Sequence, residues 1–312
     1  MVVPFLIREA ITFASLLSLL AIGLTLTFLT TRVPNFAHGT FATVGAYVTL
    51  TSIHVFSTNP YTFFPIAVLL GGAVAFALYR AILKPLKGRG ASVVSLMIAT
   101  IAFDIVLIAL INIFADYLTS LQIRSRFFQL RQFDFSIADL PGTFILSPLA
   151  AVAIIVGLHL ALTRTKFGVA MRATIENESL AGVVGINTDL VYSVSWFLSG
   201  ALAGLAGAFL GLFTIGTPNL GTFLLVSIFA ASVTGGFFSI YGAVLGGFVV
   251  GLSEIIGLNY AASLLGNWVL PYRPAIPLLA MLIVLMVARE GLTGVRWSRV
   301  AKLEVFRRGS PG

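Results

Sequence analysis

One stretch of the chain, residues 190–253, contains no charged side chain. As continuous helix, rising about 1.5 Å per residue, it is long enough for about three crossings of a hydrocarbon layer about 30 Å thick. Pro218 and the neighbouring glycines supply the breaks between the crossings. This stretch therefore predicts three membrane helices, at residues 190–216, 222–235 and 240–258.

The rest of the chain has the same character. Hydrophobic residues make up 58% of the 312 positions and charged residues only 10%, which exceeds what the core of a water-soluble domain requires. Further apolar stretches of membrane-spanning or nearly membrane-spanning length occupy residues 10–31, 39–56, 61–79, 91–115, 143–162 and 274–288. The sequence predicts an all-α, polytopic bundle of about eight or nine membrane segments, with residues 1–312 forming a single transmembrane domain.

Basic residues predict how this bundle lies in the membrane, because cytoplasmic loops carry an excess of Lys and Arg. Most of the 19 basic residues fall in three places, residues 80–89, 164–172 and the tail at 289–312, which we assign to the cytoplasm. In residues 115–141, by contrast, arginines and aspartates balance, so this segment should face outward. The basic residues that give the chain its net charge of +8 flank membrane spans, so this charge does not indicate a nucleic-acid site.

Two related motifs interrupt the apolar pattern. The stretch "PNFAHGTF" at residues 34–41 recurs, shortened, as "PNLGTF" at residues 218–223. On the predicted topology the first lies at the inner end of its helix and the second at the outer end. This arrangement is typical of an inverted-topology repeat, in which the solute path lies between the two halves.

The first motif also predicts a helix break. Pro34 lacks a backbone donor and disfavours helix at Val33, while Asn35 and His38 can satisfy exposed backbone groups. Such breaks are tolerated at membrane depth only against protein or a water-filled cavity, so Asn35 and His38 are candidates for the solute path. The alternative is an ordinary interfacial turn.

Ionisable residues within membrane helices are further candidates for the path. Asp104 lies in the middle of its apolar stretch, where it could meet the ammonium group of an amino acid or accept an internal hydrogen bond from Thr100. Glu254 lies near the predicted end of its helix and could reach the interface. The three histidines, His38, His54 and His159, stand apart from one another, so no metal site is predicted, and the absence of cysteine excludes thiolate ligands.

Residues 164–189 form a long polar segment on the predicted cytoplasmic side. Asn177 can cap a short helix whose first residue is Glu178, and Gly185 can end it in the left-handed conformation. Such a helix suits docking onto a cytoplasmic partner, although a solvated connection explains the composition equally well.

Small-xxx-small spacing lets helix backbones approach closely. It occurs in four glycine pairs: Gly200 with Gly204, Gly207 with Gly211, Gly242 with Gly246, and Gly247 with Gly251. Packing within the bundle explains each pair better than a dimer interface does.

Four stretches together carry a family resemblance: "RVPNFAHG", "RTKFGVAMRATIENESLAGVVGIN", "SGALAGLAGAFLG" and "TGGFFSIYGAVLGGFVVGLSE". In this order and spacing, along nearly the whole chain, they resemble the membrane permease subunit of branched-chain amino acid ABC importers. "PNFAHG" is closer to the first of the two paired permeases of such systems.

The resemblance implies that residues 172–186 contact an ATP-hydrolysing subunit. Arg172, Glu176, Glu178, Ala181 and Gly185 belong to this loop, although its match to the wider importer consensus is loose. The implied partners are cytoplasmic ATP-binding subunits, a second permease and an extracytoplasmic solute-binding protein, in the lipid of the inner membrane. The chain has no GxxxxGK[ST] phosphate-binding loop, so we expect it to be a transport subunit without enzymatic activity or a cofactor, with ATP bound by its partners.

Other functions remain open on the sequence. Relatives of this family carry amides, urea or other small polar solutes, so the resemblance indicates the type of transporter but leaves its substrate open. A secondary transporter would use Asp104 or Glu254 for proton coupling and would need no ATPase. A channel would need a continuous pore, which glycine-packed helices do not favour.

Overall fold

The computed structural model describes residues 4–288 and 291–293, and the predicted basic tail at 289–312 lies almost entirely outside these residues. Within the described part, six helices are long and apolar enough to cross a membrane. They are α1 (Phe5–Thr31), the composite helix Pro60–Gly88, α5 (Val93–Ser120), α6 (Gly142–Arg164), α9 (Thr188–Phe213) and α11 (Ile240–Leu265). The chain is therefore an all-α, polytopic membrane protein.

Three shorter helices complete the bundle: α2 (His38–His54), α10 (Leu220–Gly235) and α12 (Ala275–Val287). Each coincides with a stretch that the sequence assigns to a crossing. The structure by itself thus supports six full-length spans, and it does not confirm the larger count of eight or nine.

The composite helix runs further than the sequence predicts. It consists of η1 (Pro60–Phe63), α3 (Phe64–Ala77), the π-helical turn η2 (Leu78–Leu83) and α4 (Lys84–Gly88). The predicted crossing ended at residue 79, but the helix continues through the basic residues because Arg80 and Lys84 both donate to Asp189 at the start of α9, each at 2.7 Å.

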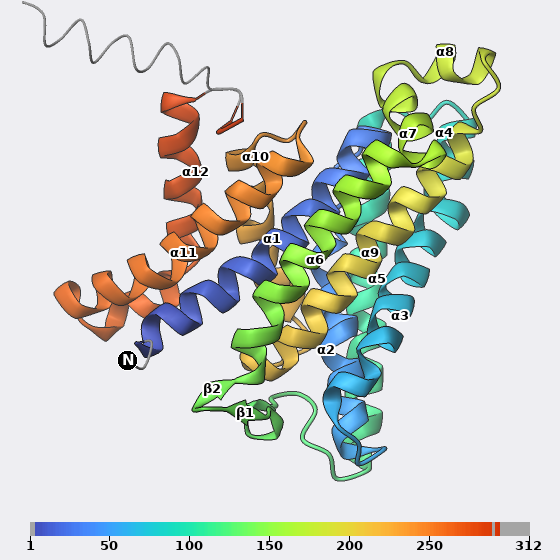
Figure 1. Cartoon of the computed structure of the whole chain (residues 1–312). Helices are drawn as coiled ribbons and strands as arrows, with labels where there is room; N and C mark the ends of the chain where they lie inside the picture. The colour runs from blue at the N-terminus through green and yellow to red at the C-terminus, as the bar shows by residue number, and fades with distance from the viewer. Residues whose placement is uncertain (1–3, 289–290, 294–312) are drawn as a thin grey trace, which may run out of the picture.

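Short elements lie at the two ends of the bundle (Figure 1). At one end α4 lies beside α7 (Lys166–Glu176) and α8 (Glu178–Val183). At the other end the segment after α5 contains η3 (Arg131–Phe133) and a small hairpin of β1 (Ser136–Ile137) and β2 (Leu140–Pro141), and η4 (Asn267–Tyr272) joins α11 to α12. The basic loops predicted to lie inside and the charge-balanced segment predicted to lie outside are thus at opposite ends.

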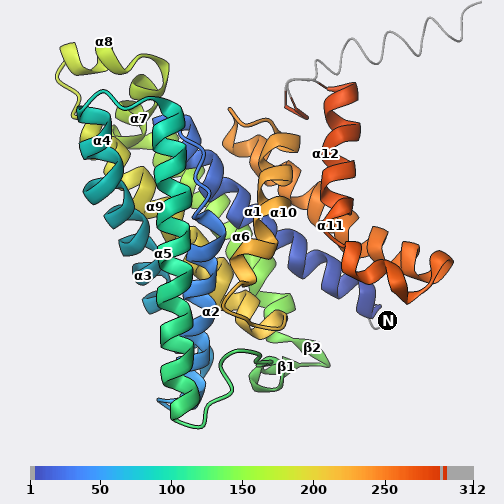
Figure 2. The ribbon, with the colours of Figure 1, turned by 180° about the vertical axis from the view of Figure 1, so that it is seen from behind.

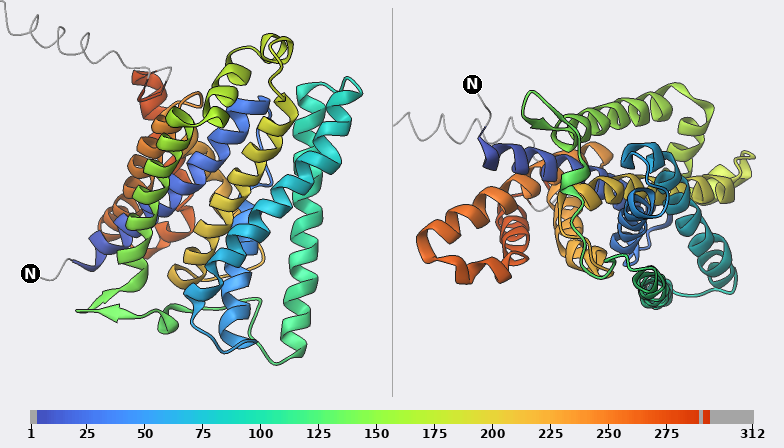
Figure 3. Two further views of the ribbon diagram at one scale, coloured as in Figure 1. Left: turned by 45° about the vertical axis from the view of Figure 1, so that its right-hand side comes forward. Right: turned by 90° about the horizontal axis from the view of Figure 1, so that it is seen from below.

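Burial decreases from the centre of the bundle outward. α1 and α9 are the most enclosed long helices, and their faces form one continuous apolar core with α2, α3 and α10. α5 and α6 lie at the periphery (Figures 1 and 2), and few of their side chains are fully buried. α11 and α12 extend sideways from the N-terminal half of α1, as the view from below shows (Figure 3).

Candidate functional site

The chain reverses direction between α1 and α2. Arg32 adopts a left-handed conformation, with φ of 56°, and no helix forms again before His38. The Nε2 atom of His38 lies 2.9 Å from the carbonyl oxygen of Leu20, in the middle of α1. Since Leu20 lies about 16 Å along α1 from its end at Thr31, residues 32–37 run back into the bundle. The predicted break is confirmed, and it lies inside the protein.

A second reversal lies between α9 and α10. α9 ends at Phe213 and α10 begins at Leu220. The intervening segment forms an antiparallel β-bridge with the loop after α5. The amide of Phe128 donates to the carbonyl oxygen of Gly216 at 3.1 Å, and the amide of Gly216 donates to the carbonyl oxygen of Phe128 at 2.8 Å. Residues 214–219 therefore enter the bundle from the end opposite to residues 32–37.

The two motifs meet where these reversals end. A methyl group added to Gly39 would lie 2.2 Å from the carbonyl oxygen of Gly221, and one added to Gly221 would lie 2.1 Å from that of Gly39. The amide of Gly221 also donates to the Oγ1 atom of Thr43 at 2.9 Å. The N-terminal ends of α2 and α10, which carry partial positive charge, thus lie together in the interior.

Asn35 and His38, the two path candidates of the first motif, are both fully buried. Asn35 accepts a hydrogen bond from the amide of Ala37 at 3.1 Å, while its Nδ2 group has no partner among the described residues. Both ring nitrogens of His38 have partners, since Nδ1 lies 3.3 Å from the Oγ atom of Ser199. A carbonyl can only accept, so Nε2 carries the hydrogen and Nδ1 accepts from Ser199. His38 therefore joins α1, α2 and α9.

α5 holds the first reversal from its outer side. The amide of Phe36 donates to Thr100 at 3.3 Å, and the Oγ1 atom of Thr40 donates to Asp104 at 2.5 Å. The proposed internal bond between Asp104 and Thr100 is absent from the described hydrogen bonds, because Thr100 donates to the carbonyl of Met97 in its own helix at 2.7 Å while Asp104 accepts from Thr40 of α2. Asp104 is half-buried, close to the start of α2.

Glu254 lies elsewhere. α11 continues to Leu265, so the expectation that Glu254 lies near a helix end is wrong. Its carboxylate is buried and accepts a 2.6 Å hydrogen bond from Nε of Arg273, whose guanidinium lies 4.7 Å from the ring centre of Phe13. This ion pair links α11, α1 and the segment before α12, and no described hydrogen bond joins it to Asn35, His38 or Asp104.

The segment at residues 164–189, which the sequence assigns to the cytoplasmic side, contains the predicted short helix. Asn177 caps α8 by accepting from the amide of Leu180 at 3.0 Å, Glu178 is its first residue, and Gly185 follows in the left-handed conformation with φ of 86°. These predictions are confirmed. The sequence missed α7, which precedes α8 and whose start is capped by Thr165.

The surface of α8 combines an ion pair with exposed apolar side chains. Ala181 is the buried residue of α8. Leu180, Val183 and Val184 are exposed, with Val183 at 84%. Glu178 accepts from Nζ of Lys87 at 2.7 and 2.9 Å. Partial burial raises the pKa of Glu178, but hydrogen bonds from Lys87 and Tyr192 outweigh it, so the pKa lies below its ordinary value. Arg172 and Glu176 are exposed on α7.

All eight glycines of the small-xxx-small pairs lie against neighbouring backbones. Each pair faces one helix: Gly200 and Gly204 face α3, Gly207 and Gly211 face α2, Gly242 and Gly246 face α10, and Gly247 and Gly251 face α1.

Sequence reasoning missed the hydroxyl groups that hold the reversals. Thr40, Thr43 and Ser199 bond to residues of the two motifs or to Asp104, and Thr100, expected to bond to Asp104, accepts from the amide of Phe36 instead. Their position on otherwise apolar membrane helices was the available signal, because such hydroxyls form hydrogen bonds between helices. The pairing of Glu178 with Lys87 also escaped notice, since Lys87 lies in a different loop.

Interrupted helices that meet inside a polytopic bundle define this protein as a membrane transport protein. The family model for "Branched-chain amino acid transport system / permease component" matches residues 6–287. The chain belongs to this family.

Named relatives are similar over nearly their full length. A probable branched-chain amino acid transport permease protein LivH of Methanocaldococcus jannaschii is 42% identical over 96% of this chain and 95% of its own. The high-affinity branched-chain amino acid transport system permease proteins BraD of Pseudomonas aeruginosa and LivH of Escherichia coli K12 are each 26% identical, over 92% of this chain and 94% of theirs. No solved structure matches the chain.

Proposed function

We propose that this chain is the membrane permease subunit of an ATP-driven importer for branched-chain amino acids, in the plasma membrane, with ATP hydrolysed by separate subunits. The observation that carries the proposal is the family match over residues 6–287, together with the 42% identity to a probable LivH permease. The proposed partners, which the family resemblance implies, are ATP-binding subunits, a second permease and an extracytoplasmic solute-binding protein.

The solute path lies between two inverted halves, one containing α1 to α5 and the other α9 to α12. Three relationships support this symmetry. Gly39 of α2 and Gly221 of α10 contact each other reciprocally. α3 packs on α9 through Gly71, and α11 packs on α1 through Gly247. The two reversals, at residues 32–37 and 214–219, enter the bundle from opposite ends.

Asn35 and Asp104 are the polar groups we assign to this path. The Nδ2 group of Asn35 is buried without a partner among the described residues, and Asp104 is half-buried beside the start of α2. His38 holds three helices together, so we assign it to positioning of the reversal. Arg273 pairs with the Oε1 atom of Glu254 and compensates its charge, while Oε2 has no partner among the described residues, so we assign Glu254 to the packing of α11 and not to the path.

Coupling to ATP hydrolysis occurs through α8. Exposed Leu180, Val183 and Val184 supply an apolar contact, and the ion pair of Glu178 with Lys87 fixes α8 to the end of the composite helix. A displacement of α8 by an ATP-binding subunit would thus act directly on α4 and the helix continuous with it. The uncovered faces of α5 and α6 are available to a second permease and to lipid.

Copurification tests this proposal. The chain, expressed with its native neighbours and solubilised in mild detergent, should retain an ATP-binding protein that is lost when Leu180 and Val183 are both replaced with Asp. The matched control is Ile137→Asp in β1, which places the same charge on an exposed apolar side chain outside the membrane spans, at the end of the bundle opposite α8. A chain that transports solute without any associated ATP-binding protein would favour the secondary transporter.

A further inference from the structure

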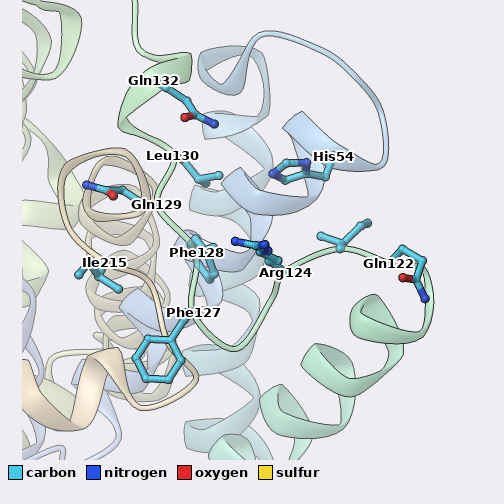
Figure 4. Close-up of a pocket in the computed structure, with 10 residues that line it drawn as sticks. His54, Gln122, Arg124, Phe127, Phe128, Gln129, Leu130, Gln132 and Ile215 are labelled. Carbon is cyan, nitrogen blue, oxygen red and sulfur yellow. The ribbon is translucent and has the colours of Figure 1, made fainter.

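A hollow of about 530 Å³ opens at the end of the bundle opposite α7 and α8. It lies between the end of α2, the segment after α5, and the second reversal, and Figure 4 shows His54, Arg124 and Leu130 around its centre. Its volume falls within the range of about 300–1,000 Å³ that small-molecule sites occupy.

Arg124 gives this hollow an uncompensated positive charge. The other two arginines of the same segment are paired, Arg126 with Asp116 at 2.6 Å and Arg131 with Glu9. Arg124 has no ion-pair partner among the described residues, and no carboxylate side chain lines the hollow. A guanidinium with free donors is a preferred partner of carboxylate groups.

The remaining lining suits an aliphatic group flanked by polar atoms. Phe128 and Leu130 are buried and form part of the wall, Ile215 extends it, and Gln122 and Gln132 supply amide donors and acceptors. The lining of the hollow thus combines apolar side chains with cationic and polar ones.

The hollow also adjoins the second reversal. Ile215 precedes Gly216, whose backbone pairs with Phe128, and the same segment continues to the contact of Gly221 with Gly39. A molecule bound in the hollow would therefore touch the outer end of the segment that leads to the centre of the bundle.

We propose that this hollow is an outer entry subsite, in which Arg124 binds the carboxylate of the solute while Phe128, Leu130 and Ile215 contact its aliphatic side chain. The inference rests on the proposed function and adds a site to it. Because no acid lines the hollow, the site recognises the carboxylate and not the ammonium group. A 2-oxo acid with the side chain of leucine should therefore bind as well as leucine, and leucinol, which lacks the carboxylate, should not.

Thiol labelling tests the site without relying on transport. A single cysteine replaces Gln132 in this cysteine-free chain, within the assembled importer in vesicles of uncharged phosphatidylcholine, without ATP or solute-binding protein. Leucine and 4-methyl-2-oxopentanoate should slow labelling of this chain, and leucinol should not. Arg124→Gln should raise the half-protecting leucine concentration about tenfold, as expected for a charge-assisted hydrogen bond at an exposed site. Arg124→Lys should retain part of the protection.

Arg126→Gln is the matched control, since Arg126 is a paired arginine of the same segment outside the lining. Equal protection by leucinol, or protection unchanged by Arg124→Gln, would overturn the subsite. So would slowing that requires anionic lipid or the solute-binding protein, because the hollow would then bind a headgroup or a protein. Normal uptake of branched-chain amino acids without any protection would refute the subsite alone, whereas failure of wild-type uptake would refute the proposed function.

Discussion

Gly39 and Gly221 pack backbone to backbone, each occupying the space that a side chain on the other would need. Each is the single glycine of its "PN" motif, and they bring the starts of α2 and α10 together in the interior. The contact depends on the absence of both side chains, which explains why each motif contains a glycine at this position.

Replacing Gly221 with Val should therefore disrupt this contact. A Cβ atom there would lie 2.1 Å from a carbonyl oxygen, so one of the two helices must move. We expect a loss of about 1–3 kcal/mol in the free energy of unfolding, the usual cost of overpacking, and a loss of uptake. The measurements are thermal unfolding in detergent and uptake normalised to the amount of inserted protein.

Gly157→Val provides the control, because a Cβ atom on this exposed glycine of α6 meets no other atom within 4 Å. If Gly221→Val and Gly157→Val behave alike in both measurements, the contact of α2 with α10 has no role in transport.

The ion pair between Lys87 and Glu178 predicts a charge-swap result. Glu178→Lys should lower ATP-driven uptake about fivefold while insertion in the membrane stays intact, since an exposed pair is worth up to about 1 kcal/mol. The double variant Lys87→Glu with Glu178→Lys should recover uptake. Equal uptake in the wild type and the single variant would remove α8 from the coupling mechanism.

The same pair has a defined pH dependence. Because the pKa of Glu178 is lowered, its contribution to stability is fully present above the ordinary glutamate pKa of about 4.3 and is lost only as the pH falls through the lower, folded value. NMR of ¹³C-labelled glutamate carboxyl groups measures the pKa of Glu178. The signal of Glu178 is assigned by its absence from the Glu178→Gln variant. A midpoint at or above the ordinary value would contradict the ion pair.

The ion pair between Glu254 and Arg273 should stabilise the fold without taking part in transport. Arg273→Met leaves a buried carboxylate without its cation and should lower the free energy of unfolding by about 2 kcal/mol. The double variant Glu254→Leu with Arg273→Met should recover most of the lost free energy of unfolding. Loss of uptake in a well-folded Glu254→Gln variant would instead implicate Glu254 in proton coupling.

Orientation in the membrane can be measured with single cysteines. A cysteine at Val183, on α8, should be shielded from an impermeant thiol reagent added outside intact cells, and one at Gln129 should react. Both side chains are exposed, so a difference in labelling reports the side of the membrane. Reaction of the Val183 position from outside would invert the topology.

The sequence predicted the parts of this fold that depend on local pattern. Apolar stretches located the helices, Pro34 located the first reversal, and Asn177 with Gly185 located α8, because each signal acts within a few residues. It did not predict that the composite helix extends to Gly88, since its final turns depend on Asp189, far along the chain.

The candidate site was predicted less completely for the same reason. The two motifs could be recognised as related, but their contact through Gly39 and Gly221 follows only from how both helices fold back. Glu254 appeared to lie near a helix end because the predicted crossing stopped at residue 258, whereas α11 continues to Leu265, and its cation, Arg273, lies beyond a separate turn. The partners of His38 and Asp104 likewise come from other helices, which periodicity within one stretch cannot identify.

Uptake by the purified importer tests the central claim most directly. The chain is reconstituted in proteoliposomes with its ATP-binding subunits, its second permease and its solute-binding protein, and radiolabelled leucine is supplied on the side of the binding protein. We predict accumulation that requires ATP, persists without a proton gradient, and is abolished when the phosphate-binding lysine of the ATP-binding subunit is replaced. Accumulation of leucine by this chain alone, driven by a proton gradient and indifferent to ATP, would contradict the account.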